Sequence, residues 1–169
     1  MMRGHSALLR QPGAITAKYA TLQSIPVDGW GQQGNGDTSS NFARATFSII
    51  LSVDFLLDYI GINFYAVQDY KVAFVDSTES SPADLAVIDA AFSATGSRTF
   101  DLVTPSSPIY LSKGTNYISI SGASTKITSN TTDVSVTINE YLTLEGAWFA
   151  GTYSSSWTAG VVLFGRRVT

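Results

Sequence analysis

Residues able to do acid, base or metal chemistry are few in this chain. Its 169 residues include one histidine, His5, and no cysteine. A Ser-His-Asp triad needs an imidazole to accept the serine proton, and structural zinc sites need several Cys or His ligands. Because the one imidazole lies close to the start of the chain, we expect neither chemistry. Without cysteine, disulfides are excluded as well.

Carboxylates are the other groups that could act as acid and base. A glycosidase holds two of them roughly 5 to 9.5 Å apart, and a calcium site needs several oxygen ligands around a loop. The spacing selects no pair, and acids at turns usually cap the turn, so we predict no catalytic residues, no metal and no cofactor. The candidates weighed for a pair are Asp54, Asp58, Asp69, Asp76, Asp84, Asp89, Asp101, Asp133, Glu140 and Glu145. Those weighed for calcium are Asp69, Asp76, Glu79 and Asp84.

Aromatic residues carry a further signal. Trp148, Tyr153 and Trp157 flank the stretch 154–156, which is three consecutive serines. Exposed aromatic rings beside hydroxyls are a common means of holding sugar rings or partner surfaces. The large apolar area of tryptophan favours burial in a core or a subunit contact instead. We take these three residues as candidate glycan or partner contacts and leave both interpretations open.

Alternating apolar and polar residues predict most of the secondary structure. The two-residue period of a half-buried strand is clear after Phe47, Ile60 and Val134, and turn residues separate about nine such runs. Residues 82–94 fit either a helix or a turn followed by a strand, and we favour the strand. We predict an all-β, antiparallel β-sandwich, jelly-roll-like, in which 109–111 and 116–121 form a hairpin and 151–160 form a loop.

The first part of the chain has a different composition. We predict that residues 1–41 form an extended N-terminal attachment arm and that 42–169 form the sandwich domain, because 29–40 is too rich in Gly and small polar residues to order itself alone. The first 20 residues hold no acid, but so few basic residues do not predict nucleic-acid binding. Candidate anchoring residues are Arg3, Arg10, Lys18 and Trp30.

The most apolar stretch does not predict a membrane span. It covers residues 42–67, alternates in polarity, and is interrupted by Arg44, Asp54 and Asp58. A transmembrane helix needs about 20 predominantly apolar residues. We also expect no secretory signal, because the apolar run at 7–9 is short and is soon followed by Pro12.

Part of the sequence resembles a known group of modules. The runs Phe100-Asp101-Leu102-Val103-Thr104-Pro105 and Ile109-Tyr110-Leu111-Ser112-Lys113-Gly114-Thr115-Asn116-Tyr117-Ile118-Ser119-Ile120 carry the likeness. They resemble a hairpin in small β-sandwich modules of bacteriophage tail, fibre and head-decoration proteins, and of some surface-attached bacterial proteins. The resemblance covers roughly residues 42–121. It implies a non-enzymatic virion component anchored by its arm to a shell, tail or neck, and it carries over no functional residue.

Composition adds an expectation about assembly. Charged residues make up 14% of the chain and the net charge is −3, against roughly 25% charged residues in an average domain. Such a surface suits a homo-oligomer, for which we favour a trimer, in contact with capsid, tail or neck proteins. The predicted function is a head-decoration or tail/fibre subunit of a phage-like virion. The alternative is a carbohydrate-binding module for host attachment, and a weaker option is a carboxylate hydrolase.

Overall fold

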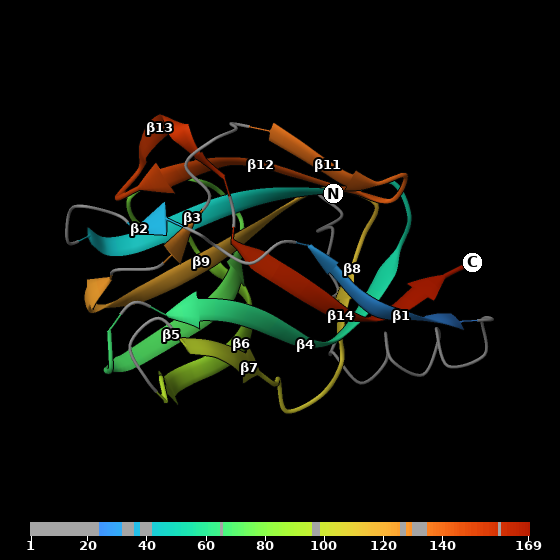
Figure 1. Ribbon diagram of the computed structural model, residues 1–169, viewed down its shortest axis with the longest axis horizontal. Coiled ribbons are helices and arrows are strands. Elements are labelled where there is room, and N and C mark those ends of the chain that lie inside the picture. Colours follow the sequence, from blue (N-terminus) through green and yellow to red (C-terminus); the bar gives the residue numbers. More distant parts are fainter. Residues whose placement is uncertain are drawn as a thin grey trace, which may run out of the picture.

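The structure is a computed structural model that describes residues 24–31, 36–37, 42–64, 66–95, 99–125, 128–129, 135–158 and 160–169. In these ranges the chain forms fourteen strands, all paired antiparallel, and two large sheets pack face to face (Figure 1). The predicted all-β, antiparallel β-sandwich is therefore confirmed.

The first sheet has the order β1-β14-β4-β7, with β8 also paired to β4. Its strands are β1 (Ser24–Gly31), β14 (Val161–Val168), β4 (Phe55–Phe64), β7 (Thr99–Val103) and β8 (Ile109–Leu111).

The second sheet has the order β11-β12-β3-β9-β5-β6, with β13 also paired to β12. Its strands are β11 (Ser135–Asn139), β12 (Leu142–Phe149), β3 (Phe42–Leu51), β9 (Gly114–Thr125), β5 (Asp69–Val75), β6 (Asp84–Ser93) and β13 (Thr152–Thr158). A small separate pair joins β2 (Gly36–Asp37) to β10 (Thr128–Ser129). The chain passes repeatedly between the large sheets, as in jelly-roll-like sandwiches.

The core lies between the inner faces of the two sheets. Strand alternation directs one set of side chains inward from each strand, and these side chains are at most 1% exposed in β3, β4 and β9. Removing this apolar surface from water is the main stabilising contribution. The inward side chains of these three strands include Phe47, Ile49, Leu51, Ile60, Ile62, Phe64, Ile118 and Ile120.

The structure settles three local predictions. Residues 84–93 form a strand, β6, as favoured. The hairpin predicted from 109–111 and 116–121 is wrong: β8 pairs with β4 in the first sheet, whereas β9 pairs with β3 and β5 in the second. The alternation is genuine, but the two-residue connection carries the chain across the core to the other sheet.

The loop predicted at 151–160 is also wrong. β12 and β13 form a hairpin through a two-residue turn, Ala150 and Gly151, with φ angles of 48° and 85°. Positive φ at both central residues matches the twist of a hairpin. Glycine adopts this conformation freely, and Ala150 adopts it at a cost. The serine-rich composition suggested a loop, but the turn chemistry places 152–158 in a strand.

The sheet also begins earlier in the chain than the sandwich boundary predicted at residue 42. β1 pairs along β14 from Ser24 opposite Val168 to Gly31 opposite Val162. It forms one edge of the first sheet (Figure 1). Of the four candidate anchoring residues, Trp30 lies in β1. The other three lie outside the described residues: Arg3, Arg10 and Lys18.

Trp30 fastens β1 to the body of the protein. Its ring stacks on Tyr141 with centroids 5.2 Å apart and lies 5.3 Å from the ring of Phe55. The guanidinium carbon of Arg167 lies 4.5 Å from the centroid of Tyr141, on that ring, a favourable cation–π contact. Because Tyr141 lies in the turn between β11 and β12, this stack joins the two sheets at one end of the sandwich.

The opposite edge of the second sheet is irregular. β6 pairs with β5 through three shifts of register, and each shift bends the strand locally. Leu85 and Val87 are 70% and 43% exposed there. The edge is thus apolar in part but not straight.

Replacing Trp30 tests the contribution of the stack. Trp30→Ala should lower the free energy of unfolding by about 2 to 3 kcal/mol, less than for a fully buried tryptophan because the ring is half-buried. Urea denaturation measures the change. Leu85→Ala, at an exposed edge position, should change stability by about 0.5 kcal/mol or less. Equal stabilities of the two variants would contradict a stabilising role for Trp30.

Candidate functional site

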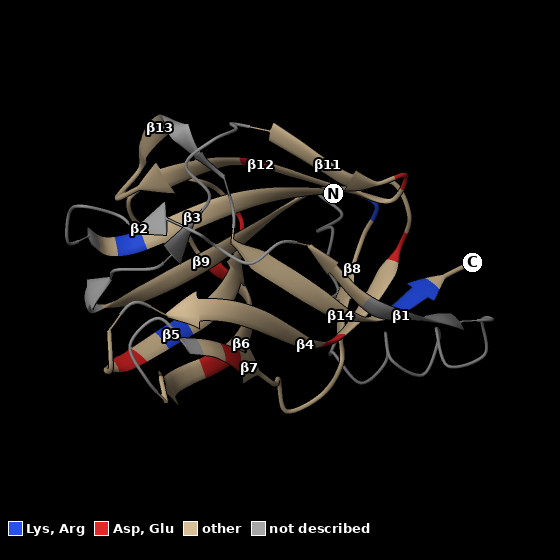
Figure 2. Ribbon diagram, in the orientation of Figure 1, with Lys and Arg blue, Asp and Glu red and all other residues tan. Residues whose placement is uncertain are grey.

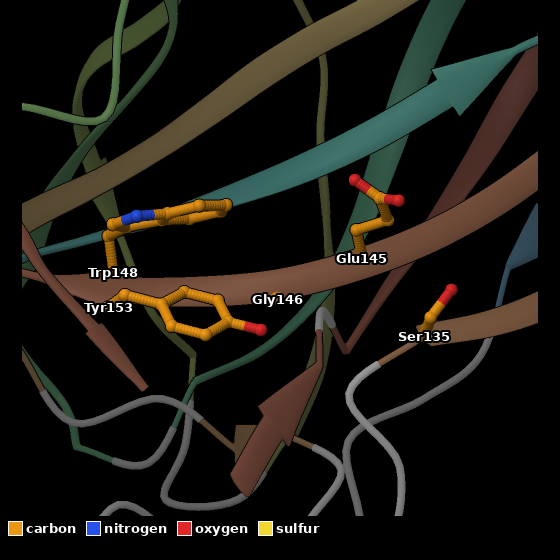
Figure 3. Close-up of a pocket in the computed structure, with 5 residues that line it drawn as sticks. All are labelled: Ser135, Glu145, Gly146, Trp148 and Tyr153. Carbon is orange, nitrogen blue, oxygen red and sulfur yellow. The ribbon is translucent and has the colours of Figure 1, made fainter. Parts of the chain in front are cut away.

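A pocket opens on the outer face of the second sheet. Its volume is about 450 Å³, within the range of roughly 300 to 1,000 Å³ typical of small-molecule sites. The aromatic rings stand at one end and the carboxylate and serine hydroxyl at the other (Figure 3). The lining residues are Ser135, Glu145, Gly146, Trp148 and Tyr153.

A β-bulge in β12 creates the pocket. Leu144 pairs with Ile49 and Ala147 with Phe47, so Glu145 and Gly146 together face the one residue between them on β3. Bulges of this kind redirect side chains and often adjoin functional sites.

The other edge of β12 changes partner at the same point. β11 pairs with β12 as far as Ser135 opposite Glu145, and β13 takes over with Thr158 opposite Gly146. The pocket therefore lies where the pairing of β12 along one edge changes from β11 to β13.

The aromatic end consists of three rings in contact. Trp148 and Tyr153 are a cross-strand pair with centroids 5.1 Å apart and planes at 51°. Tyr117 meets Trp148 edge to face at 6.3 Å and 83°. Trp148 is half-buried, whereas Tyr153 is 53% exposed. The ring of Tyr153 is thus available to a ligand, and Trp148 supports it.

These rings help to explain two buried hydroxyls. Thr46 and Ser48 are on the outer face of β3, yet each is only 1% exposed. Thr46 pairs with Trp148, and Ser48 pairs with Tyr117. The aromatic side chains on neighbouring strands shield these positions, so this part of the outer face is packed like a second, smaller core.

The polar end is held by a hydrogen bond from β3. The hydroxyl of Ser48 donates to Oε2 of Glu145 at 3.4 Å. Among the described residues Ser48 is the one hydrogen-bond partner of this carboxylate, which has about four acceptor positions. Glu145 therefore retains capacity to accept hydrogen bonds from a ligand.

Gly146 allows the ring of Tyr153 to lie where it does. A Cβ at position 146 would come within 2.4 Å of Cε2 of Tyr153 and 3.2 Å of its hydroxyl oxygen. No carbon-carbon contact is that short, so any side chain here displaces the ring. Glycine is needed for this close approach, not for an unusual backbone angle.

The site residues proposed from the sequence are only partly brought together. Trp148 and Tyr153 form the aromatic end of the pocket. Trp157 belongs to β13 by its backbone, but its side chain lies outside the described residues. Sequence reasoning missed the roles of Ser135, Glu145 and Gly146, because a bulge and a change of strand partner place them together.

Most other described acids bind to nearby groups of the protein. Asp54 accepts from the backbone N–H of Lys113 at 2.8 Å, Asp76 accepts from that of Ala83 at 2.9 Å, and Asp101 accepts from that of Thr95 at 3.0 Å. Asp58 pairs with Arg166 at 2.9 Å, and Asp84 pairs with Lys71. Asp133 lies outside the described residues.

Charges of both signs are scattered over the ribbon, and most of both sheets carries none (Figure 2). Within the described ranges no group of three or more His, Asp or Glu could hold a metal ion. The same residues include no helix long and apolar enough to cross a bilayer.

A second aromatic surface covers the outer face of the first sheet. Tyr59 and Phe164 stack with centroids 4.6 Å apart, and a Cβ at Gly61 would fall within 2.0 Å of the ring of Phe100. Leu102, opposite Gly61, is 50% exposed. We call this surface the first-sheet patch; its residues are Tyr59, Phe100, Leu102, Val162 and Phe164.

Comparison with known proteins gives no match, either to a protein-family model or to a curated protein.

Gly146→Ala should move the ring of Tyr153 without unfolding the protein. The displaced group is an exposed side chain, so the loss of stability should stay near 1 kcal/mol or below. The near-ultraviolet circular dichroism of the Trp148–Tyr153 pair should change. In a Tyr153→Ala background the same glycine substitution should change the spectrum little, since coupled residues give non-additive effects. An unchanged spectrum for Gly146→Ala alone would contradict the contact.

Proposed function

We propose that the protein is a non-enzymatic component of a phage-like virion, a head-decoration or tail/fibre subunit, that binds host-surface carbohydrate through the outer-face pocket. The observation that carries the binding function is the exposed ring of Tyr153 beside the carboxylate of Glu145 in one pocket. This pocket is formed by the β-bulge in β12. The sheet requires that bulge neither for strand pairing nor for packing of its core.

The chemistry of the pocket suits a sugar. A pyranose ring has an apolar face of C–H groups, which packs on an aromatic ring, and a rim of hydroxyls, which hydrogen-bond to acceptors and donors. In the pocket, the ring of Tyr153 can pack on the apolar face. Glu145 and the hydroxyl of Ser135 can hydrogen-bond to the sugar hydroxyls. Few polar groups at fixed positions in a mainly apolar pocket are typical of ligand sites.

Assignment to a virion has different support. The sequence resemblance between residues 100–120 and phage β-sandwich modules suggests it, although these residues do not form the hairpin of those modules. The sandwich architecture is compatible with it. The proposed localisation is the surface of the particle, and the proposed partners are capsid, tail or neck proteins. Residues 1–23, which precede β1, remain the proposed attachment segment.

The first-sheet patch favours self-association. Leu102 is exposed and the other four side chains are half-buried, on a face where an isolated sandwich usually presents polar side chains. The ion pair of Asp58 with Arg166 borders the patch through Tyr59 and supplies both signs of charge. In a contact related by a two-fold axis, the Asp58 of one copy would face the Arg166 of the other, and the reverse, as in isologous contacts. We therefore propose that a second copy of this chain covers the patch in a two-fold homodimer; a trimer would need a different, heterologous contact.

Tyr153→Ala tests carbohydrate binding. The wild-type protein should bind one or more ligands on a glycan array, and the variant should lose about tenfold or more in affinity, as expected for a stacking aromatic residue. Leu85→Ala is the control, because it removes an exposed apolar side chain from the far edge of the second sheet, outside both the pocket and the first-sheet patch. Equal losses for the two variants, or no binding by the wild-type protein, would refute the role of the pocket.

Light scattering during size-exclusion chromatography tests self-association. The wild-type protein should elute with a mass that is a multiple of 18.1 kDa. Leu102→Lys should shift it toward the monomer, because it places a charge in the patch. Leu85→Lys, on the edge of the other sheet, should leave the mass unchanged. A wild-type monomer would favour an independent sugar-binding module.

A further inference from the structure

We infer that the outer-face pocket takes an uncharged pyranose and rejects acidic sugars, with Glu145 as the residue that selects. This inference rests on the carbohydrate-binding function proposed above. It concerns the chemical class of the ligand, which depends on the arrangement of charge in the pocket and not on its shape alone.

The spacing of the rings argues against one alternative, a cage that encloses a quaternary ammonium group between ring faces. In such a cage the cation sits between or above several ring faces. The centroids of Trp148 and Tyr153 are only 5.1 Å apart, which is the separation of two rings in direct contact. No group fits between them, so a ligand must lie on the exposed side of Tyr153.

The ring of Tyr153 is held close to the sheet. Gly146 has no side chain, so this ring lies against its backbone, next to Glu145 in the chain. Figure 3 shows Glu145 and Ser135 at the far end from Trp148 and Tyr153. A sugar ring that packs on the exposed side of Tyr153 and extends toward this end would direct its hydroxyls to the carboxylate.

Glu145 is the one charged residue among the five that line the pocket. An ionised carboxylate only accepts hydrogen bonds, and such charge-assisted bonds are stronger than neutral ones. Adjacent sugar hydroxyls can donate two of them.

A uronic or sialic acid brings a second carboxylate. Placed near Glu145, it would leave acceptors facing acceptors and add repulsion between like charges. Rejection of one ligand by repulsion is a general means of specificity. Ser48 holds Glu145 from below, which limits its freedom to turn away.

The experiment compares neutral and acidic sugars of equal size on the full chain. Titrations use the methyl glycosides of glucose, galactose and mannose, the matching uronic acids, N-acetylneuraminic acid, and choline as a cationic probe. We expect binding of at least one neutral glycoside and at least tenfold weaker binding of its uronic acid. Glu145→Gln keeps the size of the side chain and should weaken binding of the neutral glycoside about tenfold. It should also reduce the difference in affinity between the neutral glycoside and its uronic acid. Glu79→Gln, an exposed acid outside the pocket, is the matched control and should change neither affinity.

The outcomes distinguish failure of the selectivity for neutral sugars from failure of carbohydrate binding itself. Equal binding of neutral and acidic sugars, unaltered by Glu145→Gln but lost in Tyr153→Ala, would overturn the selectivity and leave carbohydrate binding in place. Binding of choline that depends on Tyr153 would overturn it in favour of a cation site. If no sugar binds at all, the proposed function itself fails.

Discussion

The rest of the structure depends on the contact between the inner faces of the two sheets. Phe47, Ile60 and Ile118 are each fully buried there, so a one-residue slip in any of these strands would turn its apolar side chains outward. That constraint fixes the register of every central strand. Positions on the outer faces are then fixed in turn, although no core contact requires their chemistry. The outer-face pocket is built from these outward positions.

The bulge in β12 shows how a fixed register of the core is compatible with a pocket on the outer face. Inward residues Leu144 and Ala147 both belong to the core, yet two residues lie between them instead of one. The extra residue leaves the core contacts intact and places Glu145 and Gly146 on the same outer face. A regular strand would send one of them inward, where a carboxylate is costly to bury. The bulge therefore places the acid next to the glycine on which the ring of Tyr153 lies.

The sequence predicted those features that follow from local alternation. Inward positions of β3, β4 and β9 follow from a two-residue period, and so does the class of fold. Which strands pair does not, because 109–111 and 114–125 have the same alternation although they belong to different sheets. Trp148 and Tyr153 stood out by their residue type. Ser135 did not, and Glu145 was only one of ten acids weighed alike, because the two residues meet through a cross-strand pair. Trp30, a candidate anchoring residue of the arm, packs on Tyr141 and Phe55.

The irregular pairing of β6 affects how copies of the chain interact when they are held close together. When many copies of one chain are held close together, a long flat border with open N–H and C=O groups invites end-on growth into ribbons. β6 is the edge strand of the second sheet, and its exposed Leu85 and Val87 would strengthen the attraction. Its repeated departures from regular spacing prevent a neighbour from matching more than a few residues at a time. The molecule can therefore be packed densely while each copy keeps its own boundary.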